Sequence, residues 1–186
     1  MPEPLFELAD LQLAWRRLKL DRKRAKPRVF ILHPYLVEWT ELFLEEWLAA
    51  LLENVNQGRY TPQDCHMCAA PKGLGLVRPG AILEFEDEVV YNAILGKFHD
   101  AIWGVIGRCQ GDYDLAYQLE PRSAGERWIK AGLAVWSSFR QKSVEQLEQG
   151  AQFVLFADIT AFYENIDLEK LASDLRGIGV QQSILR

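Results

Sequence analysis

The sequence has few cysteines and no long apolar run. Its three cysteines are an odd and sparse set for 186 residues, which argues against a disulfide framework and favours a reducing compartment. The opening MPEPLFELAD has no basic segment followed by an apolar one, and no apolar stretch has the length of a membrane span. We therefore expect a cytoplasmic protein with no membrane partner.

A dominant charge of one sign is also lacking. The chain has 21 basic and 26 acidic residues and a net charge of -5, so its average field does not favour nucleic acid. One segment differs, because eight of the 21 basic residues lie within positions 16–28: Arg16, Arg17, Lys19, Arg22, Lys23, Arg24, Lys26 and Arg28. Such a cluster is either a solvated face or a contact for a phosphate backbone, and composition leaves both interpretations open.

The hydrophobic content is sufficient for a core. Hydrophobic residues make up 49% of the chain and include six tryptophans, which is typical of one domain or a large part of one. Apolar residues at helical spacing predict a short helix over 5–15 and a second helix over 36–52 that ends in the 54–58 region. A third helix is expected over 84–105, with acids in its first turn.

Two more helices are expected in the second half. The first of them spans 124–148 and ends at Gly150. Its buried face is expected to contain five apolar residues, Trp128, Ile129, Leu133, Trp136 and Phe139. The last helix begins after Asp167, a natural N-cap, and ends at Gly177.

Two segments predict β structure. Residues 66–82, HMCAAPKGLGLVRPGAI, alternate short apolar pieces with glycines and predict a hairpin with a glycine turn at its tip. Phe153–Ala157, FVLFA, is short and rich in β-forming residues, which predicts a buried strand. Asp158 follows at the carboxyl end of this strand, where open α/β sheets place ligand sites. Because an unpaired buried carboxylate is very costly, Asp158 either caps the next turn or binds a cation.

Two stretches resemble motifs of one enzyme family. Residues 157–175, ADITAFYENIDLEKLASDL, resemble the first catalytic palm motif of reverse transcriptases, in which a strand ending in Asp precedes a turn, an aromatic pair and a helix. Residues 70–95, APKGLGLVRPGAILEFEDEVVYNAIL, resemble their fingers element, with a Pro-Lys pair, a glycine turn and an Arg-Pro pair before a helix. Both occur in the family's order. The resemblance is to bacterial reverse transcriptases of the retron, group II intron and phage-defence (abortive-infection) kind.

This resemblance implies an α/β (α+β) fold with helix-rich fingers, a β-hairpin and the first strand and helix of a right-hand polymerase palm that is incomplete. It divides the chain into a helical, basic amino-terminal region at 1–60, fingers at 61–150 and the start of the palm at 151–186. It also implies template-directed nucleotidyl transfer from dNTPs, with an RNA template and a DNA or RNA primer as partners. A role in phage defence follows from the resemblance alone.

The resemblance also assigns roles to individual residues. Asp158 would be the catalytic carboxylate that binds two Mg²⁺ ions, and the backbone carbonyl of Ile159 would help to hold one of them. Lys72 and Arg78 would bind the triphosphate of the dNTP, since Arg offers a bidentate fork and Lys a point charge. Tyr163 would pack under the incoming sugar, at a position where many bacterial relatives have Phe.

The neighbouring residues are given simpler expectations. Phe162 is expected in the core. Five residues of the basic segment would contact the phosphate backbone of RNA: Arg16, Arg17, Arg22, Lys23 and Arg24. Cys65 and Cys68 form a CxxC pair, but a structural zinc site needs four suitably spaced ligands, so we expect them on the first arm of the hairpin.

The family's third motif contains paired aspartates, and this sequence has no Asp-Asp pair. One carboxylate cannot hold two metal ions, so we expect these 186 residues alone to be inactive. A carboxy-terminal part of the same protein would then be a further partner. The alternative is a catalytically silent module that binds RNA or protein on a reverse-transcriptase-like scaffold.

Overall fold

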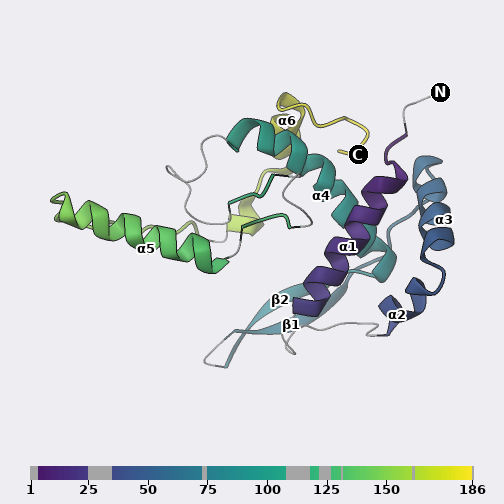
Figure 1. Ribbon diagram of the computed structural model, residues 1–186, viewed down its shortest axis with the longest axis horizontal. Coiled ribbons are helices and arrows are strands. Elements are labelled where there is room, and N and C mark those ends of the chain that lie inside the picture. Colours follow the sequence, from purple (N-terminus) through teal and green to yellow (C-terminus); the bar gives the residue numbers. More distant parts are fainter. Residues whose placement is uncertain are drawn as a thin grey trace. The chain divides into compact units, whose positions relative to one another are not determined.

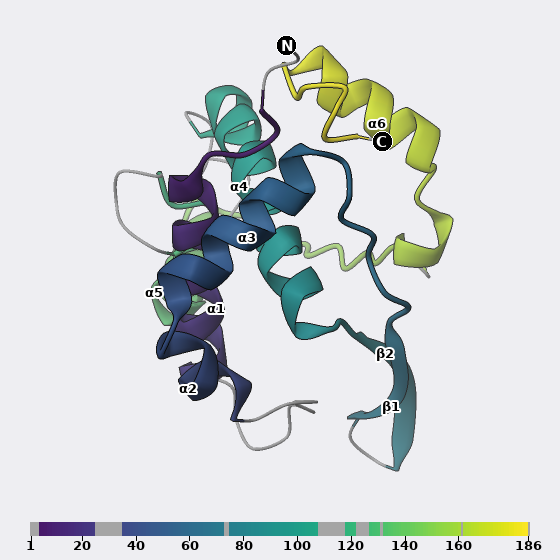
Figure 2. The same ribbon diagram turned by 90° about the vertical axis from the view of Figure 1, so that its right-hand side faces the viewer.

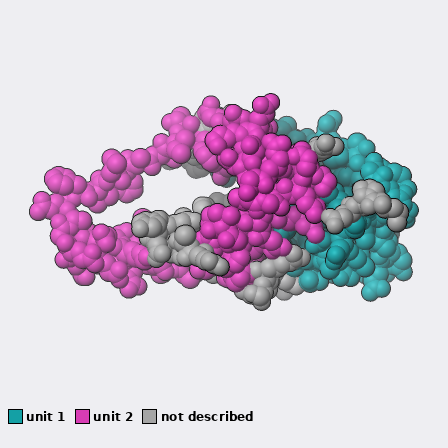
Figure 3. Space-filling model, turned by 90° about the horizontal axis from the view of Figure 1, so that it is seen from above, with its two compact units in different colours: residues 1–96 teal, residues 97–186 magenta. Residues whose placement is uncertain are grey.

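The computed structural model describes residues 4–24, 35–72, 75–107, 118–121, 127–130, 132–160 and 162–185. Its helices and one two-stranded antiparallel sheet confirm the expected mixed α and β class (Figure 1 and Figure 2). The chain divides into two compact units, unit 1 at residues 1–96 and unit 2 at residues 97–186 (Figure 3). None of the described helices is long and apolar enough to cross a bilayer. The division into fingers and palm stays a prediction.

Unit 1 has a well-defined apolar core. Its elements are α1 (Leu8–Arg24), α2 (Leu36–Glu41), α3 (Leu44–Asn56), β1 (His66–Lys72), β2 (Leu76–Ile82) and the first part of α4 (Phe85–Ile106). α1 lies beside α3 in both views (Figure 1 and Figure 2). Between the helices, the rings of Trp15, Trp47 and Phe85 pack with their centroids 5.6–5.8 Å apart. Burial of this aromatic surface helps to stabilise the unit.

The first helix is longer than predicted. α1 has 17 residues and continues through the basic segment to Arg24, whereas the apolar spacing predicted a helix only over 5–15. Lys and Arg are good helix formers, so the basic residues extend the helix instead of ending it. At the other end, the carboxylate of Asp10 accepts a hydrogen bond of 2.9 Å from the backbone N–H of Glu7, which is half of a capping box.

The predicted helix over 36–52 is two helices, so this prediction was wrong about continuity. α2 ends at Glu41, and α3 begins at Leu44 after Phe43 leaves the helical region, with φ -143° and ψ 38°. No Gly or Pro marks the break. The apolar spacing continues across it because only a short piece of backbone leaves the helical conformation, and the pattern therefore gave no signal of the break.

The predicted hairpin is confirmed. β1 and β2 pair antiparallel from His66 opposite Ile82 to Lys72 opposite Leu76. Gly75 lies in the connection with φ +75°, a left-handed conformation that costs glycine little.

Unit 2 contains a buried histidine. Besides the rest of α4, it contains α5 (Gly132–Glu148), the short 3₁₀ helix η2 (Phe162–Asn165) and α6 (Leu168–Gly177). His99 of α4 is buried, and its ring centroid lies 6.5 Å from that of Trp103 and 5.3 Å from that of Trp128. Nearby in the chain, Leu119 and Ile129 form an isolated antiparallel bridge. Residues 127–130, which were predicted to be helical, therefore include a bridge residue, and residues 124–126 of that prediction lie outside the described part.

The predicted burial of the second-half helix is also wrong. α5 begins at Gly132, and Leu133, Trp136 and Phe139 are all exposed. Only Val135 of this helix is buried. Helical periodicity establishes that an apolar face exists, but it does not show that another element covers that face.

The predicted buried strand FVLFA does not form in the described part of the chain. Residues 151–159 have no regular secondary structure, and Phe153, Leu155 and Phe156 are 90–92% exposed. Apolar runs of this kind form strands only when a neighbouring strand satisfies the backbone, and the described residues supply none here.

Three helices end with the same glycine motif. Gly58, Gly150 and Gly179 have φ of 68°, 97° and 96°, and each donates its N–H to a carbonyl three residues earlier. The next residue bonds five residues back in each case, which is the Schellman arrangement. The ends predicted in the 54–58 region and at Gly150 are confirmed, whereas Gly177 is the last helical residue and Gly179 provides the stop.

Candidate functional site

The predicted triphosphate-binding residues lie on the hairpin of unit 1. Lys72 is the last residue of β1 and pairs with Leu76, and Arg78 of β2 pairs with Ala70. Because alternate residues of a strand share a face, positions 72 and 78 lie on one face of the two-stranded ribbon. Arg78 is exposed, and the side chain of Lys72 is outside the described part. The register therefore places two basic positions on the same side of the hairpin.

Polar contacts connect the base of the hairpin to the start of α4. Nε2 of His66 lies 2.6 Å from Oε1 of Glu84. Asp87 accepts one hydrogen bond from the hydroxyl of Tyr60 and another, of 3.1 Å, from the backbone N–H of Gln63. Burial, followed by the hydrogen bond to Asp87 and its negative charge, raises the pKa of Tyr60 well above its usual value. The phenol therefore stays neutral and keeps donating to the buried carboxylate.

The predicted catalytic carboxylate lies in the exposed segment of unit 2. Asp158 and Ile159 are both exposed and belong to the stretch without regular structure. The side chain of Asp158 makes no hydrogen bond or ion pair with another described residue. It therefore caps no turn of the described chain, which was the simpler of the two interpretations of this acid.

The predicted sugar-packing residue is equally accessible. Tyr163 lies in η2 and is 86% exposed, and its ring contacts Phe162 edge-on at 5.4 Å. Phe162 is half exposed, so its expected place in the core was wrong.

After η2 in the chain, the side chain of Asp167 accepts hydrogen bonds of 3.0 Å from the backbone N–H groups of Glu169 and Lys170. The predicted N-cap is confirmed, and it fixes where α6 begins.

The donor atoms at Asp158 fit a hard cation in part. A carboxylate and the carbonyl of Ile159 are oxygen ligands of the type that Mg²⁺ takes, and both residues are exposed. Among the described residues, however, no group of three or more His, Cys, Asp or Glu side chains could hold a metal ion. A two-ion site at Asp158 would therefore need ligands beyond this carboxylate, and the metal role of Asp158 stays a prediction.

The predicted site residues fall into two groups. The hairpin positions belong to unit 1, whereas Asp158, Ile159 and Tyr163 belong to unit 2. Within each unit the residues are close in the fold or in the chain. Their convergence on one bound nucleotide stays a prediction.

Arg17 and Arg22 of the basic segment are held within unit 1. Arg17 is buried in α1. Arg22 pairs with Glu88 of α4, and its guanidinium lies 5.2 Å from the centre of the Phe85 ring. The side chain of Arg22 therefore joins α1 to α4, and phosphate would have to compete with these contacts for Arg22.

The other predicted RNA contacts are Arg16, Lys23 and Arg24. Arg16 lies on α1 and is exposed. Lys23 and Arg24 belong to the last turn of α1, and their side chains are outside the described part. RNA binding by the basic segment stays a prediction.

The CxxC pair lies where the hairpin prediction placed it. Cys65 is exposed just before β1, and Cys68 is a partly buried residue of β1. On the paired strand, Sγ of Cys68 lies next to Gly80, and a Cβ added to Gly80 would be 3.0 Å from this sulfur. His66, between the two cysteines, is the partner of Glu84.

The chain matches no protein-family model, no curated protein and no solved structure. The family resemblance therefore rests on the two motifs of the sequence.

Sequence reasoning missed two polar features. The contact of Tyr60 with Asp87 was hidden because the two residues are far apart in the chain and neither belongs to a motif. The second is His99, which is buried; neither of its ring nitrogens has a hydrogen-bond partner among the described residues, and Nδ1 lies 3.6 Å from Oδ1 of Asp100. Neither feature has a local sequence signal, since both depend on tertiary packing.

Proposed function

We propose that this chain is the fingers and the first palm segment of a reverse transcriptase, an RNA-directed DNA polymerase that uses dNTPs and two Mg²⁺ ions. The proposal rests on one observation. The two motifs occur in the family's order, the first at Lys72 to Arg78 and the second at Asp158 to Tyr163, and Arg78, Asp158 and Tyr163 are all exposed.

The hairpin supports the proposed triphosphate contact. Its two basic positions share a face, and Gly75 lets the tip approach a ligand without a side chain. A triphosphate carries several negative charges, which Arg78 could bind through two parallel N–H groups while Lys72 adds a point charge.

The exposed segment supports the proposed role of the acid. Nucleotide addition is phosphoryl transfer, in which negative charge spreads over the phosphate oxygens, so positioning and positive charge provide most of the catalysis. Bound Mg²⁺ would supply that charge to the attacking and leaving oxygens. Asp158 would hold the metal, the carbonyl of Ile159 would assist, and the ring of Tyr163 would support the sugar.

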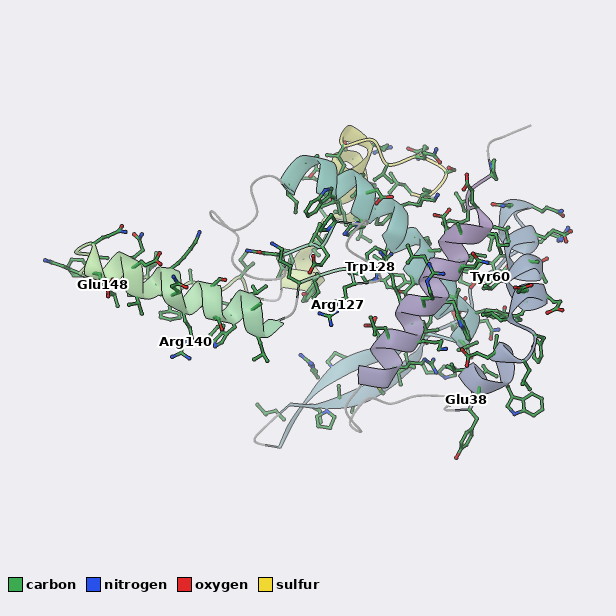
Figure 4. All side chains as sticks on the ribbon, in the orientation of Figure 1. Glu38, Tyr60, Arg127, Trp128, Arg140 and Glu148 are labelled. Atoms are coloured by element: carbon green, nitrogen blue, oxygen red, sulfur yellow. The ribbon has the colours of Figure 1, made fainter. Side chains whose placement is uncertain are left out.

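Nucleotide binding can be tested on the 186-residue chain itself. A fluorescent dNTP analogue, N-methylanthraniloyl-dATP, is titrated with Mg²⁺ present and its anisotropy is followed. Arg78→Ala should weaken binding about tenfold or more, because a charge-assisted hydrogen bond contributes roughly 1.5–3 kcal/mol. The matched control is Arg140→Ala on α5, an exposed arginine outside both motifs (Figure 4). Equal losses in both variants would indicate general charge attraction and not a site.

Catalysis is tested on the whole reading frame that contains this chain. If an aromatic-x-Asp-Asp motif follows, primer extension on an RNA template should be abolished by Asp158→Ala and unchanged by Glu169→Gln, an exposed acid of α6. RNA affinity should be similar in both variants. Retained incorporation in Asp158→Ala would overturn the metal assignment, and the lack of any such motif would favour the silent binding module.

A further inference from the structure

Unit 1 contains a pocket that none of the roles above uses. It lies between α2, α3 and the start of α4 and has a volume of about 370 Å³. Five of its twelve lining residues are aromatic: Trp39, Phe43, Trp47, Tyr60 and Phe85. Three carboxylates also line it, Glu84, Glu86 and Asp87, and no Lys, Arg or His is among the described lining residues. An aromatic and acidic lining of this kind has a negative electrostatic potential.

The aromatic walls are accessible. Trp39 is 66% exposed and Phe43 is 44% exposed, although large aromatic side chains usually contribute to cores. Trp39 belongs to α2 and Phe43 stands at the break between α2 and α3, and both rings line the pocket. Their ring faces are available to a ligand, and the face of an aromatic ring attracts cations.

The three carboxylates are not equivalent. Asp87 is buried and already accepts hydrogen bonds from Tyr60 and Gln63. Glu84 is the partner of His66. Glu86 is exposed and makes no hydrogen bond or ion pair with another described residue. Its carboxylate is therefore the one that can bind a ligand without breaking an existing contact.

We propose that this pocket binds the side chain of an arginine presented by a peptide or protein partner. A guanidinium is planar, stacks on aromatic rings and pairs with a carboxylate through two N–H groups, and it is less strongly hydrated than an ammonium. The volume is at the lower end of the range for ligand pockets and suits one or two side chains. Nucleotides and RNA are unsuitable occupants because the lining carboxylates repel phosphate. The proposal is independent of the proposed polymerase function.

The binding test follows the NMR signals of the two tryptophans that line the pocket and of one that lies outside it. The capped tripeptide acetyl-Gly-Arg-Gly-amide is titrated into ¹⁵N-labelled protein, and the indole N–H signals are followed by NMR. The signals of Trp39 and Trp47 should shift, whereas that of Trp136 on α5, outside the pocket, should not. Replacing Arg by citrulline, a neutral side chain of the same shape, should weaken binding at least about tenfold. Equal binding of the citrulline peptide would overturn the proposal.

Two acidic residues provide a matched pair of variants. Glu86→Gln should weaken binding of the arginine tripeptide at least about fivefold, because it removes the accessible carboxylate of the pocket. Glu38→Gln removes an equal charge from the exposed surface of α2, outside the lining (Figure 4), and should change affinity less than about twofold. Equal effects of the two substitutions would mean that general attraction, and not this pocket, binds the peptide.

Two further ligands test whether the pocket prefers a guanidinium to an ammonium and whether it requires a peptide. A lysine tripeptide should bind more weakly than the arginine tripeptide because of its stronger hydration, and a tighter lysine complex would overturn the choice of guanidinium. Agmatine carries the guanidinium without a peptide backbone. If agmatine binds as tightly as the arginine tripeptide, the partner is a free guanidinium compound and the peptide part of the proposal is wrong.

Discussion

The two units contain similar apolar patterns but differ in how many of the apolar side chains are buried. In unit 1, apolar residues of α1, α3 and α4 meet in a cluster of twelve buried side chains. In unit 2, Val135 and Val180 are the only apolar side chains of the described residues that are fully buried. Both units contain aromatic residues at helical spacing, but Trp15, Trp47 and Phe85 of unit 1 pack on one another, whereas Trp136 and Phe139 of α5 are exposed. Apolar spacing therefore predicts which residues share a face, while burial depends on what packs against that face.

This difference concerns stability as well as geometry. Buried apolar surface contributes about 25 cal/mol per Å², so unit 1 is held together by its own side chains. Unit 2 has exposed apolar surface on α5 and at FVLFA instead, and contiguous patches of this kind mark interaction or aggregation sites. We expect hydrogen exchange to be slow in α1 and α3 and fast in residues 151–160, because local stability follows buried contacts.

The largest effect is expected from the same substitution made once in each unit. Leu48→Ala removes a side chain that is 1% exposed and should cost about 2–5 kcal/mol of unfolding free energy, since it leaves a cavity. Leu147→Ala acts on an exposed residue of α5 and should cost less than about 0.5 kcal/mol. Denaturant unfolding followed by circular dichroism measures both. Similar costs would show that unit 2 buries Leu147 in solution, and the contrast between the units would fail.

A second large effect is expected at Tyr60. Tyr60→Phe removes the hydroxyl that donates to buried Asp87 and should cost about 1–3 kcal/mol at neutral pH, because a buried acceptor loses a partner. Since the pKa of Tyr60 is raised on folding, its contribution is fully present below the unfolded tyrosine pKa of about 10 and is lost as pH rises above that value. The native protein should therefore lose stability at alkaline pH more steeply than Tyr60→Phe.

Thermal unfolding across that pH range measures the difference. A Tyr35→Phe variant is a useful control, because Tyr35 is 77% exposed. It should follow the native protein at every pH. If Tyr60→Phe also follows it, the contact with Asp87 contributes nothing to the stability of unit 1.

Local signals in the sequence predicted local structure well. The hairpin was predictable from its glycines, the start of α6 from Asp167, and the end of α5 from Gly150, because each is fixed by neighbouring backbone. The break at Phe43 was not predictable, since the aromatic spacing continues across it and no breaker residue marks it. Phe43 also lines the pocket of unit 1, which the sequence therefore did not predict either.

The unsuccessful predictions of burial and of the FVLFA strand concerned long-range packing. Phe153–Ala157 was predicted as a buried strand from its composition, but a strand needs a partner and composition does not specify one. Phe162 and the face of α5 were assigned to the core for the same reason and are exposed. For the candidate site, the sequence supplied the residues and the order of the motifs, whereas the contact of Tyr60 with Asp87 required the fold.

A smaller effect is expected at the N-cap of α6. Asp167→Ala removes the acceptor of two backbone N–H groups and should destabilise this helix by about 1 kcal/mol. Asp174→Ala is the matched control, because it removes only an exposed pair with Lys170, which contributes roughly 0.3–0.5 kcal/mol. Hydrogen exchange at Glu169 and Lys170 measures both variants. A larger effect from Asp174→Ala would show that the cap is not what holds this part of unit 2.

The smallest effect on stability, and the sharpest test of the comparison, is expected in FVLFA. The triple substitution Phe153→Ser, Leu155→Ser and Phe156→Ser acts on side chains that are at least 90% exposed, so unfolding free energy should change by less than about 0.5 kcal/mol per site. Self-association should fall clearly, because an exposed apolar segment with unpaired backbone is a template for pairing with another chain.

Sedimentation velocity over a range of concentrations measures that association, with Leu42→Ser on unit 1 as the control. Leu42 is 80% exposed but stands at a helix end, so its substitution should leave association unchanged. A native chain that is monomeric at every concentration would show that FVLFA is not adhesive. A large loss of stability in the triple variant would show instead that the segment is buried in solution, and the contrast between the two units would then disappear.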